Sequence, residues 1–365
     1  MNKLIVEALS LDYHKTFGFQ EYLFNLLKFF KEHRNDIHVD SVIIVCKEID
    51  RHAFVQFEPE LNVVGLEIRG TLHKYLVLNT LYKRLNLSKN DIILYTNNYG
   101  ALIKQCKYLL VIHDLLYLRK KYMPNFMFRL QRSLFVPRSA RIADKVIGIS
   151  QWVRKDIIYQ FGVNQEKVSS IYNYFNFDKF EGVPDEAIVN QFKGKKYFLV
   201  VCAGAYHKNT ITTLKSFTKY VLEGGEYGLI TIGTYTNEIQ SYISNSSQQV
   251  RNMIYNLHGI SNASLGFLYK HAIGYISATM FEGLGMPIVE ALYFDVPCLL
   301  SDIEVVKEVS CGKAIYFHPT DVDALANHMH NIDKIKSCAT KSYMIEMFSS
   351  KETVGKYIDL INSFC

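Results

Sequence analysis

The stretch Thr279–Leu292 carries two glutamates, Glu282 and Glu290, and the seven residues between them include two glycines and a proline. The apolar run just before it, 272–277, predicts a short buried strand. Pro287 suits the first turn of a helix, where its missing N–H costs nothing and its φ is already set. We therefore predict a strand, a loop and a helix in this order. Glu282 is expected in the loop and Glu290 in the first helical turn.

The turn between the two glutamates has the properties of a ligand site. Gly283 and Gly285 allow a ligand to approach the backbone closely, with Leu284 between them and Met286 after them. The free N–H groups at the start of the following helix favour an anion. Backbone amides can bind a phosphate and carboxylates can bind hydroxyl groups, so this turn suits a phosphorylated sugar. An ordinary turn with solvated glutamates is the alternative interpretation.

These residues resemble a known motif. Glu282 and Glu290, with Gly-Leu-Gly-Met-Pro between them, resemble the paired glutamates of the retaining nucleotide-sugar glycosyltransferases of the GT-B fold (group 1, or family four). The resemblance is clearest over 108–150 and 197–325, about half of the chain. It is weak in the first hundred residues. It implies an α/β fold of two Rossmann-like domains whose parallel sheets face each other across a cleft.

The length and the order of elements support two domains. A chain of 365 residues exceeds what one core usually supports. Apolar runs of strand length alternate with amphipathic helical stretches, which predicts parallel sheets covered on both faces. We expect an N-terminal, acceptor-side domain over 1–175 and a nucleotide-sugar domain over 176–345. By resemblance, a closing helix in 346–365 returns to the first domain.

A second loop matches the family's diphosphate loop. The predicted strand 197–202 leads into Gly204 and then Lys208, after which a helix begins. Lys208 falls on the lysine that, in the family, holds the diphosphate. Relatives usually add an arginine in this loop, whereas this chain has His207, a weaker and pH-dependent phosphate ligand.

His113 ends another predicted strand and is followed by Asp114. The resemblance implies that His113 faces the donor sugar and its phosphate. A structural hydrogen-bonding role is the alternative. His113, Glu282 and Lys208 are the expected catalytic residues. The expected donor-binding residues are Gly18, Gly204, His207, Lys208, His258, Glu282, Gly283, Leu284, Gly285, Met286 and Glu290.

The resemblance implies retaining transfer of a sugar from a nucleoside diphosphate to a hydroxyl of a saccharide, polymeric or lipid-linked. We expect no metal cofactor, since Lys208 and a helix dipole would stabilise the leaving diphosphate. Two alternatives stay open: a nucleotide-sugar epimerase of the same fold, and a degenerate transferase kept as a scaffold. A dinucleotide oxidoreductase is disfavoured, because no Gly-x-Gly-x-x-Gly follows a predicted strand.

The charge distribution is uneven. Residues 1–175 hold 25 Lys or Arg and 16 Asp or Glu, and ten of these basic residues lie between Lys104 and Lys145. Bulky apolar residues of this region, in 124–135, alternate with Arg129 and Arg132. Such a helix can lie on an anionic membrane, or face the core with a solvated basic side. We expect a cytoplasmic protein, with the inner membrane face as a site of contact and no nucleic-acid partner.

Overall fold

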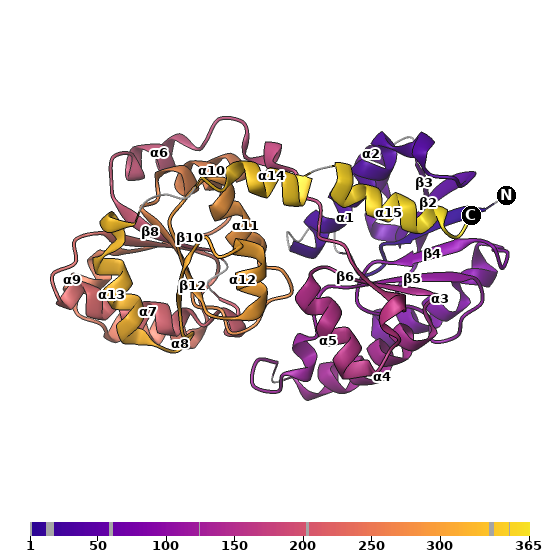
Figure 1. Ribbon diagram of the computed structural model, residues 1–365, viewed down its shortest axis with the longest axis horizontal. Helices are drawn as coiled ribbons and strands as arrows, with labels where there is room; N and C mark the ends of the chain where they lie inside the picture. Colours follow the sequence, from indigo (N-terminus) through magenta and orange to yellow (C-terminus); the bar gives the residue numbers. More distant parts are fainter. Residues whose placement is uncertain are drawn as a thin grey trace. The chain divides into compact units, whose positions relative to one another are not determined.

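The computed structural model describes residues 2–11, 18–57, 61–123, 125–201, 204–335, 339–349 and 351–365. It divides into two compact units (Figure 1). The N-terminal unit comprises Met1–Phe175 and Met347–Cys365, and the C-terminal unit comprises Asn176–Glu346. Each unit is an α/β layer structure built on one parallel sheet, as the alternation of strands and helices predicted.

The N-terminal sheet has seven parallel strands in the order β3-β2-β1-β4-β5-β6-β7. Its central strands are nearly continuous apolar runs buried on both faces, as a covered parallel sheet requires. The strands are β1 Lys3–Glu7, β2 Ser41–Lys47, β3 Asn62–Leu66, β4 Ile92–Tyr95, β5 Lys107–Ile112, β6 Lys145–Gly148 and β7 Val168–Ser170. The helices are α1 Gly18–Glu32, α2 Arg51–Phe57, α3 Gly70–Arg84, α4 Phe126–Ile142, α5 Gln151–Phe161 and α15 Lys351–Asn362.

The C-terminal helix α15 packs in the N-terminal unit although it ends the chain. Tyr357 of α15 and Tyr22 of α1 share a buried hydrogen bond of 2.9 Å between their hydroxyls. Asn362 accepts from the backbone N–H of His38. The helix α14, Lys341–Ser349, precedes α15 and leads from one unit to the other.

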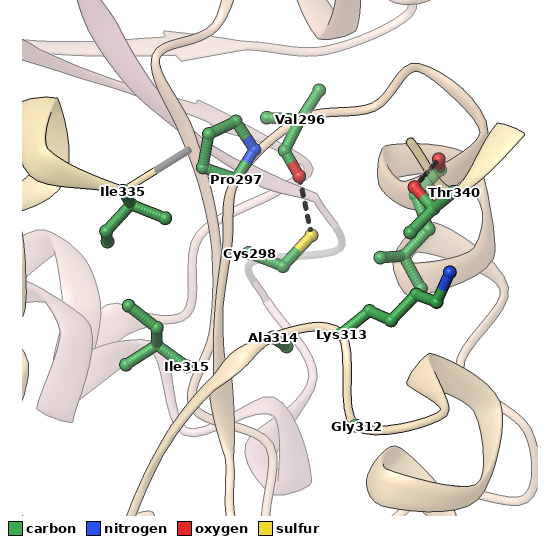
Figure 2. A pocket seen from close by; sticks show the side chains of 10 residues that line it. Val296, Pro297, Cys298, Gly312, Lys313, Ala314, Ile315, Ile335 and Thr340 are labelled. Atoms are coloured by element: carbon green, nitrogen blue, oxygen red, sulfur yellow. Dashed lines mark hydrogen bonds between the residues drawn. The ribbon is translucent and has the colours of Figure 1, made fainter. Parts of the chain in front are cut away.

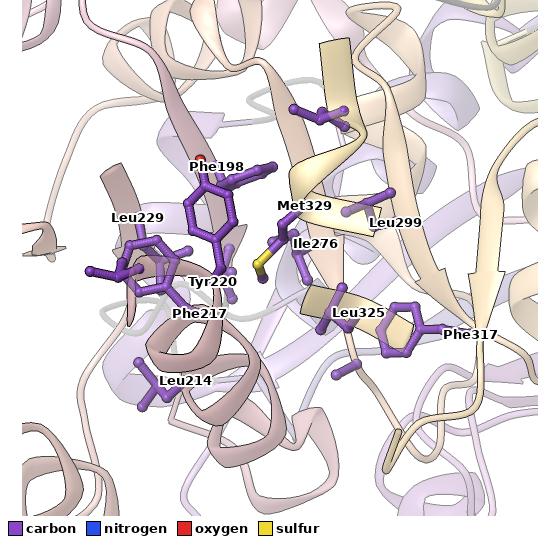
Figure 3. Packing of buried hydrophobic residues seen from close by; sticks show 14 of the residues in the cluster. Phe198, Leu214, Phe217, Tyr220, Leu229, Ile276, Leu299, Phe317, Leu325 and Met329 are labelled. Atoms are coloured by element: carbon purple, nitrogen blue, oxygen red, sulfur yellow. The ribbon is translucent and has the colours of Figure 1, made fainter. Parts of the chain in front are cut away.

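The C-terminal sheet has six parallel strands in the order β10-β9-β8-β11-β12-β13. Its core is an apolar cluster in which the inner faces of α7 and α13 meet one face of the sheet (Figure 3). The strands are β8 Tyr197–Val201, β9 Gly228–Ile232, β10 Ile254–Leu257, β11 Gly274–Ser277, β12 Cys298–Ser301 and β13 Ile315–Phe317. The helices are α6 Glu186–Phe192, α7 Thr210–Leu222, α8 Asn237–Asn245, α9 Gln248–Asn252, α10 Asn262–His271, α11 Met286–Tyr293, α12 Glu304–Ser310 and α13 Val322–His330.

Both sheets reverse their strand order at one point. In the N-terminal sheet this switch lies between β1 and β4, and in the C-terminal sheet between β8 and β11. Ligands of doubly wound sheets bind outside the carboxyl ends of the strands at such a switch. A ligand site is therefore expected at the loops that follow these four strands.

One predicted position is wrong by a turn. Helix α11 begins at Met286 with Pro287 in its first turn, as predicted. Glu290 is its fifth residue and so lies in the second turn, not the first.

The packing of α4 disagrees with one of the two interpretations that the sequence analysis gave for this basic segment. Arg129 donates from Nε to the Tyr117 carbonyl (3.0 Å), and the Arg132 guanidinium lies 4.5 Å from the centre of the Phe128 ring. Large apolar side chains on another face of the helix are exposed instead. The interpretation of a core-facing helix with a solvated basic side is therefore wrong for these two arginines.

Across the described ranges, none of the helices combines the length and the apolar character that crossing a membrane would require.

Candidate functional site

Two loops meet at the switch point of the C-terminal sheet. One follows β8 and leads into α7, and the other follows β11 and leads into α11. Thr279 Oγ1 and the Met280 N–H both donate to the carbonyl of His207, at 3.2 and 2.8 Å. The two loops are thus bonded to each other, and the residues they carry share one place.

A buried ion pair joins the same loops. Lys208 Nζ lies 2.6 Å from Glu282 Oε1, and the two side chains are 17% and 9% exposed. Removing Lys208 would leave an uncompensated charge on the buried Glu282, at a cost of about 3–5 kcal/mol. Each residue therefore holds the other in position. The structure brings together the lysine and the glutamate that the sequence analysis assigned to the donor.

Two glycines are required by the geometry of these loops. Gly285 is the N-cap of α11 with φ of +90°, a conformation that residues with side chains rarely adopt. A Cβ on Gly204 would lie 1.8 Å from the carbonyl oxygen of Thr234. A side chain at Gly204 would consequently push the Lys208 loop away from Thr234, which follows β9.

Glu290 is held by residues that the sequence analysis did not identify. Lys179 donates to Glu290 Oε1 (2.7 Å), and the Tyr269 hydroxyl lies 2.9 Å from Oε2. Lys179 is 111 residues away in sequence, and no local pattern connects it to Glu290.

The remaining predicted residues of this unit divide into two groups. Gly283, Leu284 and Met286 belong to the turn that starts α11. His258 is exposed in the loop after β10, and β9 separates β10 from β8. His258 is thus not part of the Lys208–Glu282 cluster.

A cavity of about 590 Å³ lies beside the two loops, within the usual range for ligand sites. Gly204, Tyr206 and Met280 contribute to its wall, together with Lys215 from α7 and Glu238 from α8. A second cavity, of about 130 Å³, lies at the opposite edge of the sheet, where β12 and β13 begin (Figure 2). It is too small for a nucleotide sugar and includes none of the predicted site residues.

In the N-terminal unit, His113 follows β5 and is bonded to the loop after β4. Its Nε2 lies 2.8 Å from the Thr96 carbonyl oxygen, and its backbone N–H donates to Asn98 Oδ1 (2.6 Å). A carbonyl only accepts, so Nε2 carries the hydrogen of the neutral ring and Nδ1 is the acceptor nitrogen. Burial lowers the pKa of His113, which favours this neutral form. The structural hydrogen-bonding role is thus observed.

Gly18 is the first residue of α1, and residues 12–17 before it lie outside the described part of the chain.

Glu7, the last residue of β1, is completely buried at the N-terminal switch point. Among the described residues, neither of its carboxyl oxygens has a hydrogen-bond partner of ordinary geometry. Burial raises the pKa of Glu7, although the charge of Lys74 and the backbone at Leu9 oppose the shift. The folded protein therefore retains the Glu7 proton at pH values where the unfolded chain has released it.

We expect Glu7→Gln to stabilise the N-terminal unit at neutral and alkaline pH, by about 1 kcal/mol, or roughly 2–4 °C in Tm. Because the folded pKa is raised, the carboxyl destabilises the fold progressively as the pH rises from its unfolded value of 4.5. The gain should vanish at pH 4. Thermal melts of both proteins between pH 4 and 9 measure the gain in Tm. An equal gain at all pH values would show that it does not come from the ionisation of Glu7.

Within the described ranges there is no group of three or more His, Cys, Asp or Glu placed to hold a metal ion. The one Asp-x-Asp sequence, Asp321-Val322-Asp323, begins α13. Asp321 caps that helix by accepting from the Ala324 N–H, and Asp323 pairs with Lys219. Both carboxylates thus already serve the structure of α13.

Two family models match the chain. The model described as "Glycosyl transferases group 1" matches residues 184–343, and the model described as "Glycosyltransferase Family 4" matches residues 18–179. The first match contains the Lys208 loop and both glutamates, and the second contains His113.

Two relatives matched by sequence are described as mannosyltransferases. The O-antigen chain mannosyltransferase RfbU of Salmonella typhimurium is 25% identical over 257 residues, which cover 68% of each protein. The serotype-specific mannosyltransferase WbdA of Escherichia coli is 27% identical over 233 residues, 58% of this chain and 28% of that longer protein.

Solved structures share the fold over the whole chain. Anabaena Alr3699/HepE in complex with UDP matches with a TM-score of 0.73, 16% identity and complete coverage of both chains. The lipopolysaccharide outer core galactosyltransferase WaaB in its apo form matches with a TM-score of 0.69, 15% identity and complete coverage of both chains. At these identities the likeness shows the fold alone.

Proposed function

Because the chain belongs to the group 1 glycosyltransferases and has their GT-B fold, we propose that it transfers a hexose, with retention of anomeric configuration, from a nucleoside diphosphate sugar to a saccharide hydroxyl. The observation that carries this proposal is the buried pair of Lys208 and Glu282 at the switch point of the C-terminal sheet. It combines a cation for a diphosphate with a carboxylate for sugar hydroxyls, beside the N-terminus of α11.

The proposed chemistry is electrostatic. Lys208 and the N–H groups at the start of α11 stabilise the charge that develops on the leaving diphosphate. Glu282 accepts hydrogen bonds from the hydroxyls of the donor sugar, and Glu290 from the ribose of the nucleotide. His113, whose Nδ1 is an acceptor in the neutral ring, accepts a hydrogen bond from a hydroxyl of the donor sugar. Since Lys208 and the helix N-terminus supply positive charge where a metal would otherwise do so, transfer is proposed to need no metal ion.

Mannose is the proposed sugar, and a growing surface polysaccharide on a lipid carrier is the proposed acceptor. The support comes from the relatives. One is described as an O-antigen chain mannosyltransferase and another as a serotype-specific mannosyltransferase.

An exposed apolar face of α4 supports a contact with the lipid surface that would carry such an acceptor. Phe126, Met127, Leu130 and Leu134 are 66%, 69%, 44% and 65% exposed, and their spacing places them on one face of the helix. Arg138 and Arg141 continue this face, and Lys120 and Lys121 are exposed before the helix. An apolar face beside basic residues fits an anionic bilayer, which we propose as its occupant.

We expect the double variant Phe126→Ser/Leu134→Ser to bind vesicles containing phosphatidylglycerol at least about tenfold more weakly than the unmodified protein, since each removed side chain would lose burial in lipid. Cosedimentation with these vesicles measures the binding, with pure phosphatidylcholine as the neutral surface. Leu222→Ser, which removes an exposed leucine of α7, is the matched control. Equal binding by all three proteins would contradict the assignment.

The test of the proposed function has two steps. Thermal-shift measurements with GDP, UDP, ADP, CDP and dTDP identify the nucleotide, and the matching sugar nucleotides, with mannose first, are then incubated with and without a saccharide acceptor. We expect stabilisation by one diphosphate and transfer that needs the acceptor and persists in EDTA. Conversion of the donor without acceptor would indicate an epimerase. Absence of both binding and turnover would favour a scaffold, and activity lost in EDTA but restored by magnesium would overturn the metal-free mechanism.

A further inference from the structure

The first turn of the C-terminal unit, Phe177–Phe180, is fixed by aromatic packing. The Phe177 ring stacks on Tyr293 of α11, with centroids 4.0 Å apart and an interplanar angle of 2°. Phe180 meets Tyr269 of α10 and Phe294 edge to face, at 6.2 and 5.1 Å. This turn therefore has a definite position relative to α10 and α11.

In sequence, Lys179 lies between these two phenylalanines. Because their packing fixes the turn, the Lys179 side chain reaches Glu290. Its Nζ is 2.7 Å from Glu290 Oε1, and the two side chains are 13% and 6% exposed. The Tyr269 hydroxyl lies 2.9 Å from Oε2 of the same carboxylate and 3.2 Å from the Pro287 carbonyl oxygen. Both oxygens of Glu290 are thus engaged by groups from separate elements, and the carboxylate cannot rotate freely.

A carboxylate held in this way is still able to bind a ligand. Its two oxygens offer about four lone-pair positions, of which Lys179 and Tyr269 use one each. The remaining positions have set directions, because the ammonium group and the phenol fix the plane of the carboxylate. Two neighbouring hydroxyl groups, such as those of ribose, can donate to such an acceptor, and hydrogen bonds to an ionised acceptor are roughly twice as strong as neutral ones.

We propose that Lys179 and Tyr269 are positioning residues that orient Glu290 to recognise the ribose hydroxyls of the donor nucleotide, an inference that rests on the function proposed above. The pair would make this site selective for ribonucleotides over deoxyribonucleotides. If the contacts served only to attach the first turn of the unit to α11, their removal would lower stability without changing that selectivity.

The test measures selectivity as well as affinity. Isothermal titration compares GDP and UDP with their 2′-deoxy and 3′-deoxy counterparts on the full chain. We expect the unmodified protein to prefer the ribonucleotide by about tenfold, equivalent to 1.4 kcal/mol. In Lys179→Met and in Tyr269→Phe, which keeps the ring and its packing, this preference should fall to about twofold, since the carboxylate loses one of its two anchors. Lys179→Arg should restore most of it.

Lys196→Met is the matched control, because Lys196 pairs with Asp333 on the surface of the same unit. It should keep the full preference. Unchanged selectivity in both Lys179→Met and Tyr269→Phe would overturn the inference, and so would equal binding of ribo- and deoxyribonucleotides by the unmodified protein. Both outcomes leave the proposed transfer intact, although the second would remove the ribose contact proposed for Glu290. A protein that binds none of the nucleoside diphosphates would instead fail the proposed function itself.

Discussion

Glu282→Ala is expected to abolish sugar transfer, with kcat/KM reduced by about a thousandfold or more. The substitution removes the proposed acceptor for the sugar hydroxyls. It also leaves Lys208 without its carboxylate partner at 2.6 Å. Initial rates over a range of donor concentrations, at saturating acceptor, measure the loss. Full activity of the purified variant would show that Glu282 has no part in the reaction.

Two further variants separate the causes of this loss. Glu282→Gln keeps an acceptor oxygen and removes the charge, so it should retain more activity than Glu282→Ala. Glu304→Ala removes an exposed carboxylate from the first turn of the neighbouring helix α12 and should remain fully active. Thermal melts of all three proteins check that the C-terminal unit stays folded. We expect it to do so in Glu282→Ala, because the flexible lysine stem can turn its ammonium group toward water.

Local patterns in the sequence were sufficient for the elements that carry the site. Continuous apolar runs predicted β5 and β8, since central parallel strands are buried on both faces. Pro287 predicted the start of α11 correctly. The switch-point rule then explains why Lys208 and Glu282 meet although 74 residues separate them. Edge strands such as β3, which is only partly buried, lack this signal and were not predicted.

Contacts formed by packing could not be predicted from local patterns. Lys179 reaches Glu290 because aromatic rings from three segments fix its turn, and nothing near Lys179 in sequence indicates this. The orientation of α4 is a similar case. Its arginines and its large apolar residues are interspersed, so periodicity alone does not determine which of them faces the sheet, and Arg129 is bonded to a carbonyl of the preceding segment.

The second large effect is expected for Lys208→Met. We predict that it lowers kcat/KM by about 10²–10³-fold, because the leaving diphosphate loses its proposed cation. Affinity for the nucleoside diphosphate should fall as well, whereas affinity for the free nucleoside should not change. Titrations with both ligands measure this difference. Lys208→Arg, which keeps the charge, should retain part of the activity, and equal losses for both ligands would point to a damaged fold instead of a missing phosphate contact.

The pairing of Lys208 with Glu282 allows one further distinction. In Lys208→Met the buried Glu282 carboxylate has lost its partner, so this variant should be less stable than the double variant Lys208→Met/Glu282→Gln, in which no uncompensated charge remains. Activity should not follow stability, since the double variant lacks both the proposed phosphate cation and the charge of the proposed sugar contact, and should be at least as inactive as either single variant. Melting temperatures and rates of the four proteins form a double-mutant cycle. If the double variant regained activity together with stability, Lys208 and Glu282 would support the fold without contacting the donor.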